Sequence, residues 1–193
     1  PSLLPKYRGG APIQHAVMNG EKETGVCLMQ MVKAMDAGVV YACEHLPIGE
    51  DETFSELNSR LIELSIKMMK EALPKYIAGE LPGVPQDEAG VIIAPNISRE
   101  EEQVHFQEET LDVLYNHIRG LIDWPIAYGM LEGVRIKFYK VRKENGTQSS
   151  PAGTVLGFAD HAMTVACRGC ILKVYELQME GKKRMDTAAF LRG

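Results

Sequence analysis

The segment from Gly25 to Gly38 reads Gly-Val-Cys-Leu-Met-Gln-Met-Val-Lys-Ala-Met-Asp-Ala-Gly, an apolar run followed by one carboxylate in a turn that contains glycine. The residues from Val26 to Val32 are typical of a buried strand, and a similar run from Val39 to Leu46 predicts a second strand after the turn. Asp36 is therefore expected at the end of a strand. A rigid sheet can present a polar group to a substrate at such a position.

Asp36 has two interpretations on local sequence alone. An aspartate at a strand end can orient a histidine or hold a water molecule for catalysis. Asp-Ala-Gly is also ordinary turn sequence, because an Asp side chain bonds nearby backbone amides and Gly readily adopts positive φ. The local pattern favours the plain turn and leaves the catalytic interpretation open.

The composition is that of an ordinary globular protein, with 193 residues, 45% of them hydrophobic and 24% charged. The apolar runs are much shorter than the ~18 residues that a membrane span needs, and the first residues do not resemble a signal peptide, so a cytoplasmic protein is expected. The sequence begins at Pro1, inside a motif, and we expect it to be a piece of a longer polypeptide.

The four cysteines do not indicate a disulfide scaffold. Cys167 and Cys170 have the spacing of a redox or metal pair, but strand-like residues flank them, and the intervening Arg-Gly is better explained as a hairpin turn. No second pair with matching spacing could complete a zinc site, so no metal is expected.

Charge is distributed unevenly along the chain. Residues 1–125 carry 10 Lys and Arg against 20 Asp and Glu, a net charge of −10, whereas residues 126–193 carry 11 against 6, a net charge of +5, in agreement with the total of −5. A basic C-terminal part is expected to contact an anion such as nucleic acid, although a solvated basic face is the alternative.

Helices are predicted where capping signals and apolar periodicity coincide. A helix is expected from Pro12 to about Met18, and a longer one is expected to start after Thr53, which forms a capping box with Glu56. An apolar stripe along this longer helix predicts its core-facing side; the stripe consists of Leu57, Leu61, Leu64, Met68 and Leu73.

Residues 79–95 contain several prolines and glycines and are interpreted as a linker or an extended crossing segment. A short strand from Val104 to Phe106 and a helix from Thr110 to Leu121 are expected to follow. Trp124 after the helix is expected to be a hinge-packing anchor, with a stacking contact to a ligand as the alternative.

Short alternating runs after Pro125 predict about five strands and hence a small barrel. The predicted strands are Ala127 to Leu131, Val134 to Val141, Gly153 to Phe158, Met163 to Cys167 and Ile171 to Leu177. A short final helix is expected from Asp186 to Leu191.

Several motifs resemble the formyltransferase family that uses 10-formyltetrahydrofolate. They are Ser2 to Ile13, Glu23 to Gly25 and Met35 to Gly38. Further segments resemble the members of this family that formylate methionyl-tRNA; these are Gly120 to Pro125, Ala152 to Thr154 and Leu177 to Met185. The similarity runs from Pro1 almost to Gly193. Cys27, Leu28 and Lys33 depart from the usual pattern, but none of these departures removes a reacting group.

The resemblance implies an α/β fold in which the C-terminal half of an open Rossmann-like formyltransferase domain precedes a small OB-like β-barrel domain. It implies that residues 1–80 belong to the catalytic domain, that residues 81–97 form a linker, and that residues 98–193 form the tRNA-binding domain with a leading helix. The intact enzyme is expected to be a monomer.

The resemblance also implies a reaction, the transfer of a formyl group from 10-formyltetrahydrofolate to the methionine amino group of initiator methionyl-tRNA. Asp36 would act with an Asn-x-His pair that precedes Pro1, so residues 1–193 alone are expected to be inactive. The implied folate-binding residues are Ser2, Leu3, Leu4, Pro5, Val32, Lys33, Ala34, Met35 and Ala37. Lys182, Lys183 and Arg184, adjacent cations in the basic part, are expected to bind the tRNA backbone.

Three alternatives remain open on sequence alone. The formyl acceptor could be an amino-sugar nucleotide, or water in a formyl-folate hydrolase, since these relatives share the chemistry. The chain could also be a non-catalytic RNA-binding module, which would need no upstream Asn-x-His pair.

Overall fold

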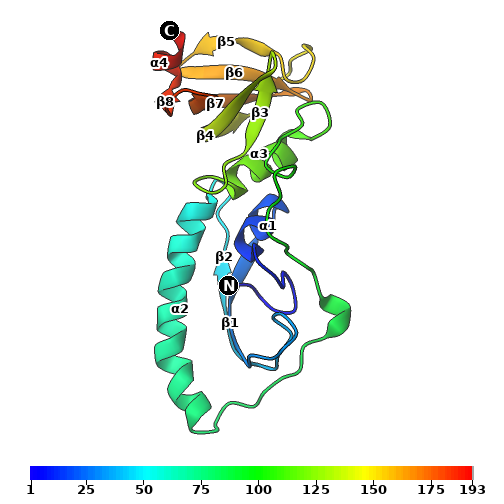
Figure 1. Ribbon diagram of the computed structural model, residues 1–193, viewed down its shortest axis with the longest axis vertical. Coiled ribbons are helices and arrows are strands. Elements are labelled where there is room, and N and C mark those ends of the chain that lie inside the picture. Colours follow the sequence, from blue (N-terminus) through cyan, green and yellow to red (C-terminus); the bar gives the residue numbers. More distant parts are fainter. Residues whose placement is uncertain (193) are drawn as a thin grey trace. The chain divides into compact units, whose positions relative to one another are not determined.

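The computed structural model describes residues 1–192, which form two compact units divided between Asn96 and Ile97. The first unit contains α1 (Pro12–Met18), β1 (Glu23–Met29), β2 (Val40–Pro47), α2 (Phe54–Ile77) and a short 3-10 helix, η1 (Glu88–Gly90) (Figure 1). β1 and β2 form an antiparallel pair in which Glu23 lies opposite Pro47. The predicted helix from Pro12 to Met18 is confirmed.

β1 ends earlier than its apolar sequence predicted. The predicted strand continued to Val32, but the pairing becomes irregular after Leu28 and the strand ends at Met29. The Gln30 N–H still donates to the Val39 carbonyl at 2.8 Å, after which the chain leaves the pair. Met31 is 93% exposed, so the apolar residues after β1 belong to an open loop and not to a buried strand.

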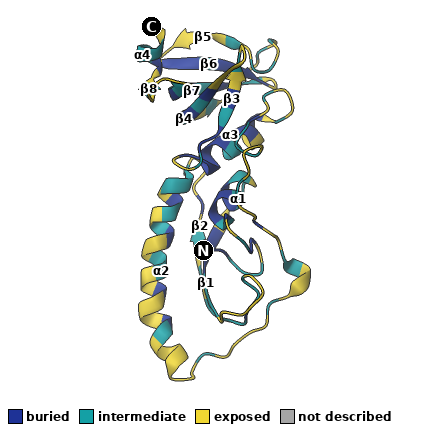
Figure 2. Ribbon diagram, viewed as in Figure 1, coloured by how far each residue is buried: buried dark blue, intermediate teal, exposed yellow. Residues whose placement is uncertain are grey.

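The α2 helix begins as predicted. The Thr53 hydroxyl accepts a hydrogen bond from the Glu56 N–H, and the Glu56 carboxylate accepts one from the Thr53 N–H at 2.9 Å, which completes the capping box. Leu57, Leu61 and Met68 are buried on the face turned toward the core, whereas most of the opposite face is exposed (Figure 2). Burial of a leucine of this kind contributes about 2 kcal/mol, so this stripe is a main source of stability for the first unit.

The segment expected to be a linker packs largely against the first unit. Val84 exchanges two backbone hydrogen bonds with Val40, and Ile93 pairs with Arg8 in a parallel bridge. Ala94 is fully buried. Residues 81–96 therefore belong to the first unit, because their backbone groups are bonded to it.

The second unit consists mainly of an antiparallel sheet. Its elements are α3 (Leu111–Gly120), β3 (Tyr128–Leu131), β4 (Val134–Glu144), β5 (Val155–Ala159), β6 (Ala162–Cys167), β7 (Cys170–Met179), β8 (Met185–Asp186) and α4 (Thr187–Leu191). The strand order is β3-β4-β7-β6-β5, and β8 pairs with β7 (Figure 1). The five strands predicted after Pro125 and the helix from Thr110 to Leu121 are present, with end shifts of a few residues.

One sequence prediction for the second unit was wrong. Residues Val104 to Phe106 do not form a strand; Gln103 makes an isolated bridge to Tyr128, and the Val104 N–H donates to the Tyr128 carbonyl. The local composition matched a strand that the tertiary structure does not use. Trp124 is 58% exposed, and its expected role as a hinge-packing anchor stays a prediction.

The cysteines have two different states. Cys27 of β1 and Cys43 of β2 lie directly opposite each other and form a disulfide, which sequence spacing did not predict. Cys167 and Cys170 are free and face each other at the hairpin between β6 and β7, as the turn interpretation predicted. Burial raises the pKa of the Cys167 thiol to about 12, which makes that thiol unreactive at neutral pH.

Candidate active site

Asp36 lies in the loop between β1 and β2 and is held in an uncommon backbone conformation, with φ of 53°. Its Oδ2 atom accepts a hydrogen bond from the Gly9 N–H at 2.9 Å. Within residues 1–192, its other oxygen, Oδ1, accepts no hydrogen bond. One oxygen therefore fixes the carboxylate, and the other is available for a partner that the described chain does not supply.

Gly9 can make this contact because it has no side chain. Its φ of 134° is accessible essentially only to glycine, and a Cβ atom at this position would collide with the backbone of Ala94. The close approach of the backbone at Gly9 and Ala94 thus brings the Gly9 N–H to Asp36.

The first residue of the chain also lies near Asp36. Burial lowers the pKa of the Pro1 amino group, and the negative charge of Asp36 has the smaller, opposite effect of raising it. Pro1 therefore lies within electrostatic range of Asp36.

The residues predicted to bind folate come from two segments of the first unit. Ser2 is buried, Leu3 to Pro5 are half-buried, and the Leu3 side chain packs against Gly25 of β1. Val32 to Met35 are exposed, whereas Ala37 is half-buried. The Gly9–Asp36 hydrogen bond and the proximity of Pro1 to Asp36 connect these two segments.

Sequence reasoning missed two polar residues next to this loop. The Gln86 amide bonds the carbonyls of Asp36 and Gly38, and the buried Arg8 guanidinium bonds Gln86. Gln86 lies in a segment predicted to be a linker and belongs to none of the quoted motifs. Arg8 lies within the Ser2 to Ile13 motif, but no role was assigned to its side chain. Only the fold brings these residues to Asp36.

The three predicted RNA-binding cations differ in their surroundings. Lys182 and Lys183 are exposed and form no ion pair with another described residue. Arg184 donates to the Glu176 carboxylate at 2.6 and 2.8 Å, and its guanidinium lies 4.5 Å from the centre of the Tyr139 ring. Arg184 therefore also has a structural role, because its charge is partly balanced within the unit.

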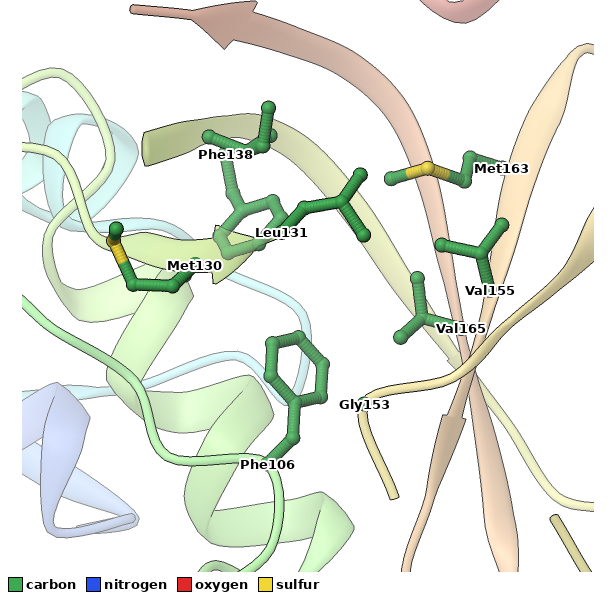
Figure 3. A pocket seen from close by; sticks show the side chains of 10 residues that line it. Phe106, Met130, Leu131, Phe138, Gly153, Val155, Met163 and Val165 are labelled. Carbon is green, nitrogen blue, oxygen red and sulfur yellow. The ribbon is translucent and has the colours of Figure 1, made fainter. Parts of the chain in front are cut away.

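An apolar pocket in the second unit does not provide a chemical site. Figure 3 shows the side chains around it, including Phe106 and Phe138, whose rings meet edge to face with 6.1 Å between their centres. The remaining lining residues are Gly129, Met130, Leu131, Ile136, Gly153, Val155, Met163 and Val165. None of these side chains is ionisable or nucleophilic, so the pocket offers no group for acid–base or nucleophilic chemistry.

No group of three or more possible metal ligands occurs among residues 1–192. None of the helices described here is long and apolar enough to span a membrane.

Comparisons with known proteins identify the family of this chain. A family model described as formyl transferase matches residues 1–73, and one described as formyl transferase, C-terminal domain, matches residues 96–193. The chain belongs to the formyltransferase family. The expected family resemblance is thereby confirmed.

One relative of this formyltransferase chain is the methionyl-tRNA formyltransferase of Halalkalibacterium halodurans, which is 40% identical over 193 residues. The alignment covers 100% of the present chain and 61% of that protein. The chain therefore spans about three fifths of the length of this curated relative.

Solved structures show that the fold is shared more widely. HypX from Aquifex aeolicus, in complex with tetrahydrofolic acid, has a TM-score of 0.79 and 20% identity, covering 99% of this chain and 34% of HypX. The N-formyltransferase from Helicobacter canadensis, in complex with folinic acid and dTDP-3-aminofucose, has a TM-score of 0.74 and 18% identity, covering 90% of this chain and 63% of that protein. At this identity the two structures support the formyltransferase fold alone.

Proposed function

We propose that this chain is the C-terminal part of an enzyme that transfers a formyl group from 10-formyltetrahydrofolate to the amino group of methionine on initiator methionyl-tRNA. The observation that carries the proposal is 40% identity to a methionyl-tRNA formyltransferase along the whole chain. The placement of Asp36 supports it, because the carboxylate is fixed on one side and open on the other.

The reaction is an acyl transfer to an amine. The amine nitrogen attacks the formyl carbon, a tetrahedral intermediate forms with negative charge on oxygen, the bond from carbon to N10 of the folate breaks, and the proton lost by the amine is returned to N10. Such a site needs hydrogen-bond donors at the oxyanion and a group that transfers protons. In this proposal, an asparagine and a histidine that precede Pro1 have these roles.

Asp36 would act through that histidine. A carboxylate near an imidazole stabilises the cationic imidazolium, which can donate a hydrogen bond to the developing oxyanion. The Oδ1 atom has no hydrogen-bond donor within residues 1–192, and Pro1 lies within electrostatic range of the carboxylate. In this proposal a histidine upstream of Pro1 is the partner of Oδ1.

The folate donor would bind between the two segments that meet at Asp36. Ser2 to Pro5 supply a partly buried wall. Met31, Val32 and Met35 supply exposed apolar side chains that a flat pterin ring could cover. Burial of this apolar surface would favour binding of the donor.

The second unit would bind the tRNA in this proposal, as an OB-like domain that starts near residue 98. Lys182 and Lys183 are free to contact phosphates, whereas Arg184 would have to keep or exchange its contact with Glu176. Phosphate contacts supply a large, sequence-independent part of RNA affinity through the release of counterions.

An acceptor assay with the intact enzyme tests the proposal. The enzyme is given 10-formyltetrahydrofolate together with charged initiator tRNA, with a dTDP-amino sugar, or with no acceptor, and formylated product and free formate are measured. We expect formylated product only when charged initiator tRNA is the acceptor. Product only from the sugar would identify an amino-sugar formyltransferase, formate without acceptor would identify a hydrolase, and RNA binding without product would identify a binding module.

A further inference from the structure

Gln86 contacts the Asp36 loop from a distant part of the chain. Its Nε2 atom donates to the Asp36 carbonyl and to the Gly38 carbonyl, each at 2.7 Å. These two carbonyls flank Ala37, so one amide group spans the turn that carries Asp36. The three residues are about 50 positions away from Gln86 in sequence.

Arg8 determines the orientation of the Gln86 amide. The Oε1 atom of Gln86 accepts from Arg8 Nε at 3.1 Å and from Arg8 Nη2 at 2.9 Å. A guanidinium group only donates hydrogen bonds and a carbonyl only accepts them. The amide must therefore direct its oxygen toward Arg8 and its NH₂ group toward the loop, since the flipped orientation would leave all four bonds unsatisfied.

The Arg8 side chain is itself fixed in place. It is buried, with 8% of its side chain exposed, and it makes a two-pronged contact with Glu88 at 2.8 and 3.2 Å. Its backbone N–H donates to the Ile92 carbonyl, and its carbonyl accepts from the Ala94 N–H. Gln86 is thus held against a rigid support.

The same short segment holds both ends of Asp36. Gly9, which follows Arg8, donates to the carboxylate, while Arg8 holds the Asp36 carbonyl through Gln86. These contacts close a ring around a residue in the left-handed backbone region. Within residues 1–192, Gly9 and Gln86 are the only residues from outside positions 31–38 that make hydrogen bonds to that loop.

We propose that Gln86 is a positioning residue for the Asp36 carboxylate, an inference that rests on the proposed function. Gln86 fixes the turn around Ala37, and this fixed turn directs the free Oδ1 atom toward the group that transfers protons. Without the amide donor, two carbonyls lose their partners and the carboxylate retains one contact, to Gly9. A small displacement of a catalytic group is enough to lower the rate substantially.

The test is Gln86→Glu in the intact enzyme. A glutamate has nearly the same shape and still accepts from Arg8, but it cannot donate to the two carbonyls. We expect kcat to fall about 10-fold or more while KM for charged tRNA stays within twofold. The matched control is Gln148→Glu in the second unit, where the amide likewise donates to a backbone carbonyl, that of Cys167, at 2.6 Å and its oxygen accepts a hydrogen bond; this change should leave kcat within twofold.

A double-mutant cycle with Asp36→Asn separates positioning from general damage to the fold. If Gln86 acts through Asp36, Gln86→Glu should lower kcat by less than about twofold in the Asp36→Asn background. An equal loss in both backgrounds, or no loss in the wild-type background, would overturn the proposal. In Gln86→Glu, amide hydrogen exchange should also become faster in residues 31–38 and stay unchanged in α2. An unchanged exchange rate in residues 31–38 would overturn the proposal as well.

Failure of the proposed function gives a different pattern. If Asp36→Asn alone keeps full turnover, then Asp36 is not catalytic, and both the assignment of Asp36 and the role of Gln86 are overturned. If Asp36→Asn is inactive but Gln86→Glu lowers kcat by the same factor in the wild-type and Asp36→Asn backgrounds, the proposed function stands and only the positioning role is overturned.

Discussion

The loop that carries Asp36 and the loop that carries Lys182 to Arg184 are built in different ways. The Asp36 loop receives hydrogen bonds from Gly9 and Gln86, which lie 27 and 50 positions from Asp36 along the chain. Among residues 1–192, the hydrogen bonds between side chains and the Lys182 to Arg184 loop involve near neighbours; Gln178 donates to the Lys182 carbonyl, and Arg184 donates to Glu176. Arg184 also contacts the more distant Tyr139 ring. The first loop is fixed by hydrogen bonds from distant residues, and the second mainly by its own hairpin.

This difference matches what each loop is proposed to do. A group that supports proton transfer must be held at a defined position, because the rate depends steeply on geometry. Cations that attract phosphates act over several ångströms and tolerate motion. We therefore expect substitutions in the Asp36 loop to have larger effects than substitutions in the loop of cations.

The largest expected effect is that of Asp36→Asn. Asparagine keeps the size of the side chain and its contact with Gly9 but removes the charge that would support the proton-transferring histidine, so kcat should fall by about 100-fold or more while folate binding stays near normal. Steady-state kinetics of the intact enzyme measures both. Asp123→Asn is the control, since Asp123 also has positive φ and lies in the other unit. Turnover of Asp36→Asn within a few-fold of wild type would reduce Asp36 to a turn residue.

A pair of glycine substitutions compares the two loops directly. Gly9→Ala should lower the free energy of unfolding by more than about 2 kcal/mol. The new methyl group would collide with the Ala94 backbone, and the alanine would also have to adopt a strained φ. Gly181→Ala should cost only about 1 kcal/mol, since its φ is 75° and no atom lies within 4 Å of the new methyl group. Chemical denaturation measures both. Equal losses would contradict the difference between a closely packed and an open loop.

Neutralising the two free lysines should affect one substrate only. In the double variant Lys182→Ala, Lys183→Ala, KM for charged tRNA should rise about 5- to 10-fold, and KM for the folate donor should not change. The salt slope, which is the slope of log K for tRNA binding against log salt concentration, should fall in magnitude by about 2. The control is Lys67→Ala with Lys70→Ala, which removes the same charge from exposed positions of α2. An unchanged salt slope would contradict a phosphate contact, and a rise in both KM values would indicate damage to the fold.

The smallest expected effect is that of Arg184→Gln. Its ion pair with Glu176 is about half exposed, so the loss of stability should be about 0.5 kcal/mol or less. The salt slope should change by less than 1, because Arg184 already has an anionic partner. Thermal denaturation and salt-dependent binding check the two values. A slope change equal to that of either lysine would show that Arg184 leaves Glu176 when RNA binds.

Much of the secondary structure was predictable from local sequence. The capping box at Thr53 and the apolar stripe from Leu57 to Met68 identified α2, because both signals depend on residues a few positions apart. The end of β1 was not predictable in the same way. Met31 and Val32 are as apolar as a buried strand, and only the loss of pairing with β2 leaves them exposed.

The candidate site was predictable in part. The family motif identified Asp36 and the Ser2 to Pro5 segment, but it could not show that Gly9 bonds the carboxylate or that Gln86 bonds the turn. The three cations at 182–184 were predicted to share one partner, the tRNA backbone, whereas Arg184 has Glu176 and Tyr139 as partners within the unit. These differences involve contacts between residues that no short sequence window contains.

By itself the sequence determined the helices, the hairpins and the family, because capping, periodicity and motifs are encoded in neighbouring residues. Only the tertiary structure decided which polar groups meet. Residues 81–96 pack back on the first unit and bring Gln86 to Asp36, and the register of β1 and β2 places Cys27 opposite Cys43. Such contacts join distant parts of the chain and form only when the core has packed, so their physical origin lies in the fold as a whole.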